Sequence, residues 1–265
     1  MEQITARGLT FDVYAAGPPD GRPVLLLHGF PQDHREFDEV LPGLHAAGLR
    51  TYAYDQRGYT PGARPAAVGD YRLTEPVADA VALLDALGLG TAHIVGHDWG
   101  AQVAWRLAAE HPERVLSLTA VSLPHPRALA RALKKSWTQR LRLAYVGVLR
   151  SAAGETVAGL LLPRFGPRAD QYAEAMRDRA RLTAALNWYR ALDDPRVPVI
   201  GRIAVPTTFV WGEQDFVVGR AAAEGTAALV DASYRFLALP GVGHWVPEEA
   251  PGPLVEAVVD RVRAS

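Results

Sequence analysis

The chain has 265 residues, of which 49% are hydrophobic and 22% are charged, and these proportions are ordinary for a water-soluble globular protein. The formal net charge of −1 gives no reason to expect nucleic acid or an anionic membrane as a partner. Because the chain has no cysteine, a disulfide framework, a thiolate metal site and a cysteine nucleophile are excluded.

The N-terminal residues do not show a basic segment followed by an apolar one, as a secretory signal would. A run of about 18 apolar residues, the length needed for a transmembrane helix, is also missing from the sequence. We therefore expect a cytoplasmic protein. The sequence does not fix the oligomeric state, and a homodimer is compatible with it.

Short apolar runs alternate with helical patterns along the first half of the chain. Residues 4–14 alternate around Gly8 and predict an antiparallel hairpin. Apolar runs predict buried strands, and periodic patterns closed by stop signals predict helices. The strands are expected at 24–27, 51–54, 92–95 and 115–121, and the helices at 75–87 and 101–110. Strands that alternate with helices predict right-handed βαβ units and a mostly parallel sheet.

The alternation stops after the strand predicted at 115–121. Mostly helical patterns follow over 128–150 and 169–192, and strands resume at 207–211 and 234–239 before a last helix at 252–263. We predict an α/β core made of residues 1–123 and 201–265. A helical cap made of residues 124–200 interrupts this core.

The most informative stretch is Gly96-His97-Asp98-Trp99-Gly100, which lies between a predicted strand and a predicted helix. Glycines on both sides of a reactive residue in a strand–turn–helix context are typical of a nucleophile elbow, here with Asp98 at the tip. A carboxylate attacks unactivated carbonyls poorly, but it can displace a leaving group at saturated carbon and form an ester on the enzyme. The sequence therefore predicts Asp98 as a nucleophile.

Two further residues follow predicted strands at the same end of the sheet. Asp215 comes after the strand at 207–211, and His244 comes after the strand at 234–239. Alone, the acid is more typical of a helix N-cap and the histidine of a structural residue. Together with Asp98 they give the chain order nucleophile, acid, histidine, at the edge where parallel sheets place their sites. We predict a catalytic set of Asp98, Asp215 and His244.

Backbone donors for a developing oxyanion are expected at two places. The turn His28-Gly29-Phe30-Pro31 can present the Phe30 N–H, and Trp99 offers a second N–H at the start of a helix. We assign the oxyanion and substrate-binding positions to His28, Phe30, Pro31 and Trp99. Within this set, His28 is expected to be structural rather than a proton carrier.

These motifs resemble the epoxide hydrolase branch of the α/β hydrolase superfamily, and the resemblance covers almost the whole chain. It implies the α/β hydrolase fold, with a mostly parallel sheet flanked by helices and a helical cap. It rests on Val95-Gly96-His97-Asp98-Trp99-Gly100, His28-Gly29-Phe30-Pro31, Gly243-His244-Trp245, the Asp after Trp211-Gly212, Asp55-Gln56-Arg57-Gly58-Tyr59 and residues 112–115.

The resemblance also implies two cap tyrosines that protonate the alkoxide released when an epoxide opens. A phenol, with an ordinary pKa of about 10, suits this task. The segment Leu186-Asn187-Trp188-Tyr189-Arg190 resembles the family segment that carries one of them. Tyr145 is the second candidate, and Tyr172 is the reserve.

The expected activity is hydrolysis of an apolar or aryl epoxide to a vicinal diol by water, without a metal or an organic cofactor. A haloalkane or haloacid dehalogenase that uses the same Asp98 is the alternative. Dehalogenases of this fold often place Asn or Glu where this chain has Phe30, which weakens that reading. A non-catalytic ligand-binding protein has no need for the full set of Asp98, Asp215 and His244.

One segment carries an unusual charge. Residues 127–150 contain seven basic residues and no acidic one. Such a segment can indicate a membrane or nucleic-acid surface, but the solvated outer face of a cap is the expected explanation in a nearly neutral chain.

Overall fold

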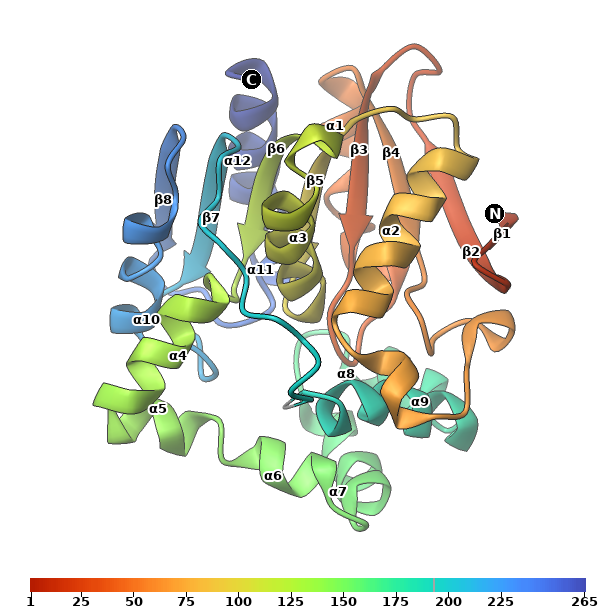
Figure 1. Ribbon diagram of the computed structural model, residues 1–265, viewed down its shortest axis with the longest axis vertical. Helices are drawn as coiled ribbons and strands as arrows, with labels where there is room; N and C mark the ends of the chain where they lie inside the picture. The colour runs from red at the N-terminus through yellow and green to blue at the C-terminus, as the bar shows by residue number, and fades with distance from the viewer. Residues whose placement is uncertain (193) are drawn as a thin grey trace.

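The computed structural model describes residues 1–192 and 194–265 (Figure 1). Its centre is one eight-stranded sheet with the order β1-β2-β4-β3-β5-β6-β7-β8, in which β1, β2 and β4 pair antiparallel and all later neighbours pair parallel. This confirms the predicted hairpin and the mostly parallel sheet. The strands are β1 (Glu2–Ala6), β2 (Leu9–Ala16), β3 (Arg22–Leu27), β4 (Leu49–Tyr54), β5 (Ala92–His97), β6 (Val115–Val121), β7 (Thr207–Gly212) and β8 (Tyr234–Leu239).

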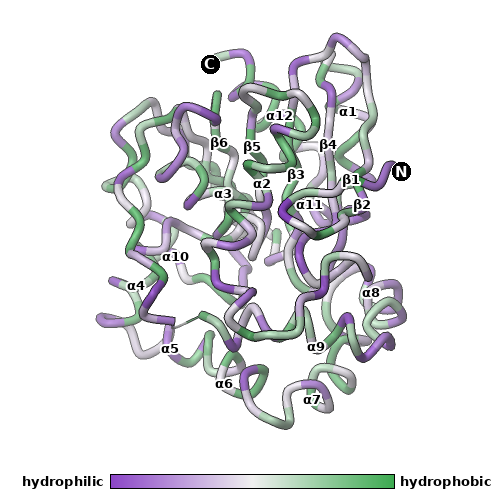
Figure 2. Tube along the Cα trace, turned by 45° about the vertical axis from the view of Figure 1, so that its right-hand side comes forward, coloured by the Kyte–Doolittle hydropathy of each residue, from purple (hydrophilic) through white to green (hydrophobic). Residues whose placement is uncertain are grey.

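The central strands are buried on both faces, which explains why they are apolar without alternation. In β3, Leu25 and Leu27 join the hydrophobic cluster on one face, while Val24 and Leu26 join the cluster on the other. Successive side chains of a strand point to opposite faces, so each face of β3 needs its own apolar set. Figure 2 shows the corresponding hydrophobic colouring along β3, β5 and β6.

Helices cover both faces of the sheet. On one face α2 (Thr74–Ala86) and α3 (Trp99–Glu110) pack together, and on the other α1 (Leu41–Ala46) packs with α12 (Pro251–Arg263). Two further short helices, α10 (Arg220–Glu224) and α11 (Val246–Glu249), follow β7 and β8. The helices α1, α10 and α11 were not predicted, because they are too short to show a clear hydrophobic period.

A helical insertion lies between β6 and β7, beyond the carboxyl ends of the parallel strands (Figure 1). It consists of α4 (Pro126–Lys135), α5 (Trp137–Arg142), α6 (Tyr145–Arg150), α7 (Gly154–Leu161), the short 3-10 helix η5 (Leu162–Arg164), α8 (Ala169–Ala175) and α9 (Arg179–Arg190). We call α4 to α9 the cap.

The two long helical patterns predicted in the cap are each broken. Ser136 leaves the helical conformation, and its side chain accepts a hydrogen bond from the Gln139 N–H, so it ends α4 and begins α5. Asp178 does the same at the start of α9, where it accepts from Ala180 and Arg181. Such side chains compete with the helical backbone and favour caps over helix interiors.

Among the described residues, no helix is both long enough and apolar enough to cross a membrane.

Candidate active site

Asp98 is held in a sharp turn between β5 and α3. Its backbone has φ +49° and ψ −118°, in the half of the Ramachandran plot that residues with a side chain rarely occupy. A Cβ at Gly96 would lie 2.3 Å from the Gly100 carbonyl oxygen, and one at Gly100 would lie 1.9 Å from the Leu27 carbonyl oxygen. Both neighbours must therefore be glycine, because the turn brings the backbone of β5, α3 and β3 into direct contact. Strain of about 1–3 kcal/mol at such a residue persists only where the surroundings enforce it.

The structure brings Asp98, Asp215 and His244 together from three loops at the carboxyl edge of the sheet. His244 Nδ1 lies 2.9 Å from Asp215 Oδ2, and His244 Nε2 lies 3.3 Å from Asp98 Oδ2. The other Asp215 oxygen accepts the N–H groups of Val217 and Val218 at 2.6 and 3.0 Å. All three side chains are buried, so Asp215 is fixed in place and orients the imidazole toward Asp98.

The electrostatics of this set favour an ionised Asp98 beside a charged histidine. Burial opposes ionisation of Asp98, but the hydrogen bond and charge of His244, together with the Phe30 N–H, hold the pKa of its carboxyl below the usual value. Burial alone would lower the pKa of His244, but the charges and hydrogen bonds of Asp215 and Asp98 raise this pKa to about 10. In the resting site, Asp98 is therefore a carboxylate.

The two expected backbone donors flank Asp98. The Phe30 N–H donates to Asp98 Oδ1 at 3.0 Å, and Trp99 is the first residue of α3. The first N–H groups of a helix have no partner within the helix, and the helix dipole adds to their attraction for negative charge.

The remaining two residues of the predicted binding turn differ in position. Pro31, which follows a cis peptide bond, lines the same pocket as Asp98. His28 is absent from the pocket lining: its Nδ1 lies 2.8 Å from the Gly29 carbonyl oxygen, and its Nε2 accepts the Gln56 N–H at 2.9 Å. Burial lowers the pKa of His28 to about 4, which fits the structural role that we expected for its neutral ring.

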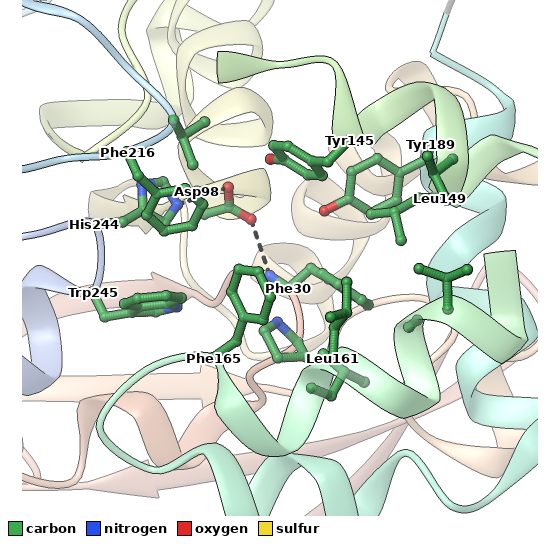
Figure 3. A pocket seen from close by; sticks show the side chains of 16 residues that line it. Phe30, Asp98, Tyr145, Leu149, Leu161, Phe165, Tyr189, Phe216, His244 and Trp245 are labelled. Carbon is green, nitrogen blue, oxygen red and sulfur yellow. Dashed lines mark hydrogen bonds and ion pairs between the residues drawn. The ribbon is translucent and has the colours of Figure 1, made fainter. Parts of the chain in front are cut away.

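Tyr145 on α6 and Tyr189 on α9 both line the pocket, and Figure 3 shows their hydroxyl groups on the side of Asp98. Burial raises the pKa of both phenols above the ordinary value, and the Asp98 charge raises it further. Both are therefore protonated donors at neutral pH. The Phe30 and Trp99 rings form T-shaped contacts with Tyr189, with ring centroids 5.3 and 5.0 Å apart, and hold its orientation.

The reserve candidate Tyr172 lies elsewhere. Its hydroxyl donates to Glu248 Oε1 at 2.5 Å, and it is absent from the pocket lining. The second tyrosine that the structure places at the pocket is thus Tyr145.

Apart from Asp98, His244 and the two tyrosine hydroxyls, the side chains of the pocket are apolar (Figure 3). They come from the turn before η1 (His34–Phe37), from the cap and from the loops that follow β7 and β8. The lining residues are Phe30, Pro31, Val148, Leu149, Val157, Ala158, Leu161, Leu162, Phe165, Phe216, Val217 and Trp245, with Asp98, Tyr145, Tyr189 and His244.

A buried polar pair beneath the histidine was not predicted from the sequence. Glu36 Oε2 accepts the Gly29 N–H at 3.2 Å and lies 3.1 Å from His97 Nδ1. His97 Nε2 lies 2.9 Å from the His244 carbonyl oxygen, which also accepts from Ser122 Oγ at 2.6 Å. Burial raises the pKa of Glu36 to about 7, and the Glu36 charge outweighs burial to raise the pKa of His97. This pair supports the loop that carries His244.

The cap is also bonded to the loop that carries Asp215. From α5, the Gln139 side chain accepts the Gly219 N–H at 2.9 Å and donates to the Val217 carbonyl oxygen at 2.8 Å. Arg142 donates to the Asp215 carbonyl oxygen at 2.6 Å. Neither residue was predicted, because no motif marks a side chain that bonds to a distant backbone.

Asp33, His34 and Asp55 are the residues in the described part of the chain whose donor atoms could surround a metal ion. Their carboxylates already have partners: Arg35 and Arg181 bind Asp33 at 2.6 and 2.8 Å, and His34 binds Asp55 at 2.8 Å. This cluster is better described as a buried ion-pair network than as a metal site.

The sequence matches the α/β hydrolase fold family over residues 22–251. Epoxide hydrolase A of Mycobacterium tuberculosis is 29% identical, over 97% of this chain and 95% of that protein. An epoxide hydrolase structure from metagenomes of hot environments has a TM-score of 0.90 at 28% identity, covering 98% of this chain and 97% of the other.

A third comparison shows the fold alone. An epoxide hydrolase variant from Bacillus megaterium, in complex with its product (R)-3-[1]naphthyloxy-propane-1,2-diol, has a TM-score of 0.85 at 21% identity. It covers 99% of this chain and 100% of that one. With its sheet, its cap between β6 and β7, and relatives along nearly the full length, this chain belongs to the α/β hydrolase fold family and, within it, to the epoxide hydrolase branch.

Proposed function

We propose that this protein hydrolyses an epoxide to a vicinal diol through a covalent ester on Asp98. The observation that carries the proposal is the facing arrangement of two protonated phenols, Tyr145 and Tyr189, and the ionised Asp98 across one apolar pocket. An epoxide that lies between them meets a nucleophile at carbon and proton donors at oxygen. In this proposal, residues 124–200 act as a cap unit that brings both phenols to the site.

In the first step, an Asp98 oxygen forms a bond to an epoxide carbon and the ring C–O bond breaks. The electron pair moves to the ring oxygen, which takes a proton from Tyr145 or Tyr189 and leaves a tyrosinate. The hydroxyalkyl ester on Asp98 is neutral, so the negative charge has moved from the carboxylate to the phenol. The phenol lowers the barrier because the departing alkoxide is a strong base.

Loss of the Asp98 charge lowers the pKa of His244, and its imidazolium gives a proton to the tyrosinate. In the second step, the neutral His244 takes a proton from water while the resulting hydroxide attacks the ester carbonyl. The Phe30 and Trp99 N–H groups hold the tetrahedral oxyanion. Cleavage of the acyl C–O bond releases the diol, which takes the proton from His244. The Asp98 carboxylic acid then gives its proton to His244, which restores the starting state. Asp215 keeps the imidazole oriented throughout.

The apolar lining favours an epoxide that carries an apolar or aryl group. Phe165, Phe216 and Trp245 contact one another edgewise or at a tilt, with ring centroids between 5.2 and 6.2 Å apart, and they form one wall of the pocket. Aromatic walls of this kind bury a substrate ring with favourable edge-to-face geometry. We therefore propose aryl epoxides such as styrene oxide as the first substrates to test.

A single turnover in ¹⁸O-labelled water tests the proposal. The label is expected in the Asp98 carboxylate and not in the diol, because the diol takes its new oxygen from the enzyme. His244→Gln is expected to accumulate an Asp98 adduct with the mass of the epoxide in intact-protein mass spectrometry.

Two outcomes would contradict the proposal. Label found only in the diol would mean that water attacks the epoxide directly. Halide release from 1-chloro-2-phenylethane, without diol formation from styrene oxide, would mean that the protein is a dehalogenase. Asp98→Ala is the control that should abolish every form of turnover.

A further inference from the structure

The exposed surface of α4 and α5 combines unpaired cations with large apolar side chains. Its members are Arg131, Lys134, Lys135, Arg140, Trp137 and Leu141, and we call this set the cap patch. Trp137 is 69% exposed and Leu141 is 65% exposed, one turn apart on α5. None of the four cations has an ion-pair partner among residues 1–192 and 194–265, whereas most arginines near the cap, such as Arg168 and Arg190, pair with acids.

The cap patch belongs to a segment of one charge sign. Residues 124–154 contain seven basic residues and no acid, so the segment carries +7 and the rest of the chain carries −8. From the sequence alone, the solvated outer face of a cap was the expected explanation of this charge. The structure adds that Ala128 and Ala132 face inward, where α4 packs on α10, so that the cations point outward beside Trp137 and Leu141.

The rim of the pocket continues this apolar surface. Val148 on α6 and Leu161 on α7 line the pocket, yet 42% and 43% of their surfaces are exposed. Leu160, next to Leu161, is also exposed. Figures 1 and 2 both show α5, α6 and α7 following one another along the outer edge of the cap. Exposed apolar side chains therefore occur on α5, α6 and α7, from the cap patch to the rim of the pocket.

We propose that the cap patch docks this protein on bilayers that contain anionic lipids. Anionic headgroups attract the four cations, and Trp137 and Leu141 enter the interface, where indole and leucyl side chains bind favourably. A second copy of this chain is a poor occupant, because a two-fold contact would oppose cation to cation. A nucleic acid would leave Leu141, Val148 and Leu161 without an apolar partner.

Docking would place the pocket rim at the phase into which apolar epoxides partition. This advantage rests on the proposed function, but the docking itself does not. Vesicle binding is measured without substrate turnover. The protein can therefore hydrolyse epoxides without binding vesicles, or bind vesicles without hydrolysing epoxides, and the two proposals can fail separately.

The test is co-sedimentation of the full-length protein with phosphatidylcholine vesicles, with and without phosphatidylglycerol. Binding is expected with phosphatidylglycerol and should weaken as salt is raised, because the Debye length falls from about 10 Å at 0.1 M to about 3 Å at 1 M. Each cation near an anionic surface contributes about 1 kcal/mol, so Lys134→Gln with Lys135→Gln should weaken binding by about 30-fold. Trp137→Ser with Leu141→Ser should also weaken it, while hydrolysis of a water-soluble epoxide is unchanged.

Matched controls come from elsewhere on the surface. Val199 is 82% exposed and lies outside the cap patch, so Val199→Ser should leave vesicle binding unchanged. Arg263, an exposed residue at the end of α12, gives the charge control Arg263→Gln. Equal binding to pure phosphatidylcholine, equal loss with the control variants, or tighter binding to duplex DNA than to vesicles would overturn the proposal. So would dimerisation through the cap patch without lipid.

Discussion

At the scale of single residues, the protonation of His244 depends on whether Asp98 carries its negative charge. Asp98 and Asp215 lie on opposite sides of His244, so the imidazole lies between two carboxylates in the resting site. If Asp98 becomes an ester, one of those charges disappears. A base that is too strongly protonated to act in the resting site then becomes available for the second half of the reaction.

The titration of His244 should follow this change in charge. Asp98→Asn removes the same charge as ester formation, so it should lower the pKa of His244 from about 10. His244 acts as a base only when neutral, so hydrolysis of the ester should fail as the pH drops below the lowered pKa, whereas alkylation of Asp98 should not. NMR titration of the imidazole and single-turnover rates across pH measure both effects. An unchanged pKa in Asp98→Asn would contradict the argument.

The two cap phenols give a second prediction at this scale. Tyr145→Phe and Tyr189→Phe should each slow alkylation of Asp98, and the double variant should lose about 10²–10⁴-fold, the usual contribution of general acid catalysis. Hydrolysis of the ester should change much less. Tyr172→Phe is the matched control, because Tyr172 is a buried cap tyrosine that bonds to Glu248. Stopped-flow kinetics with styrene oxide separate the two phases, and an equal loss in Tyr172→Phe would contradict the assignment.

The positions of the main site residues followed from the sequence because each one occupies a marked place. Asp98 lies in a glycine-flanked turn, and Asp215 and His244 follow apolar runs. Tyr145 and Tyr189 followed from resemblance to a family segment. Glu36 and His97 did not follow, because a buried pair from two distant segments leaves no local pattern.

At the scale of elements, long apolar strands and long helices were predictable, whereas breaks within helical stretches were not. The strand at 92–95 continues to His97, directly before the nucleophile. The pattern over 128–150 divides into α4, α5 and α6, and Ser136 makes the first of these two breaks because it caps both α4 and α5. A short hydroxyl side chain at one position decided this boundary, and the apolar period alone does not reveal it.

Helix α5 also bonds to the loop that carries Asp215, which gives a prediction. Gln139→Ala leaves the Gly219 N–H and the Val217 carbonyl oxygen without their partner. Because the Gln139 side chain is buried, the free energy of unfolding should fall by about 1–3 kcal/mol for each group left unsatisfied. Thr138→Ala, at the exposed neighbour, should cost far less. Urea denaturation measures both variants, and equal losses would contradict the role of Gln139.

At the scale of the whole molecule, the sequence predicted the order of the layers and the place of the insertion. Alternation of strands and helices, its interruption after β6 and its return at β7 were all visible in the apolar pattern. The path of the cap across the carboxyl edge was not visible, since it depends on the packing of α6 and α7 against α9, which is distant from both in sequence. The dense pairing of arginines with acids outside the cap patch was equally invisible before the fold placed them together.

The insertion of the cap between β6 and β7 has a consequence for the order in which the protein is made. Asp98 leaves the ribosome early, the phenols follow, and the imidazole comes last, after β8 has been synthesised. Because β8 pairs with β7 at the edge of the sheet, His244 reaches its position only after this last strand has docked. A growing chain therefore carries the proposed nucleophile for most of translation without the proposed base that would release a trapped adduct.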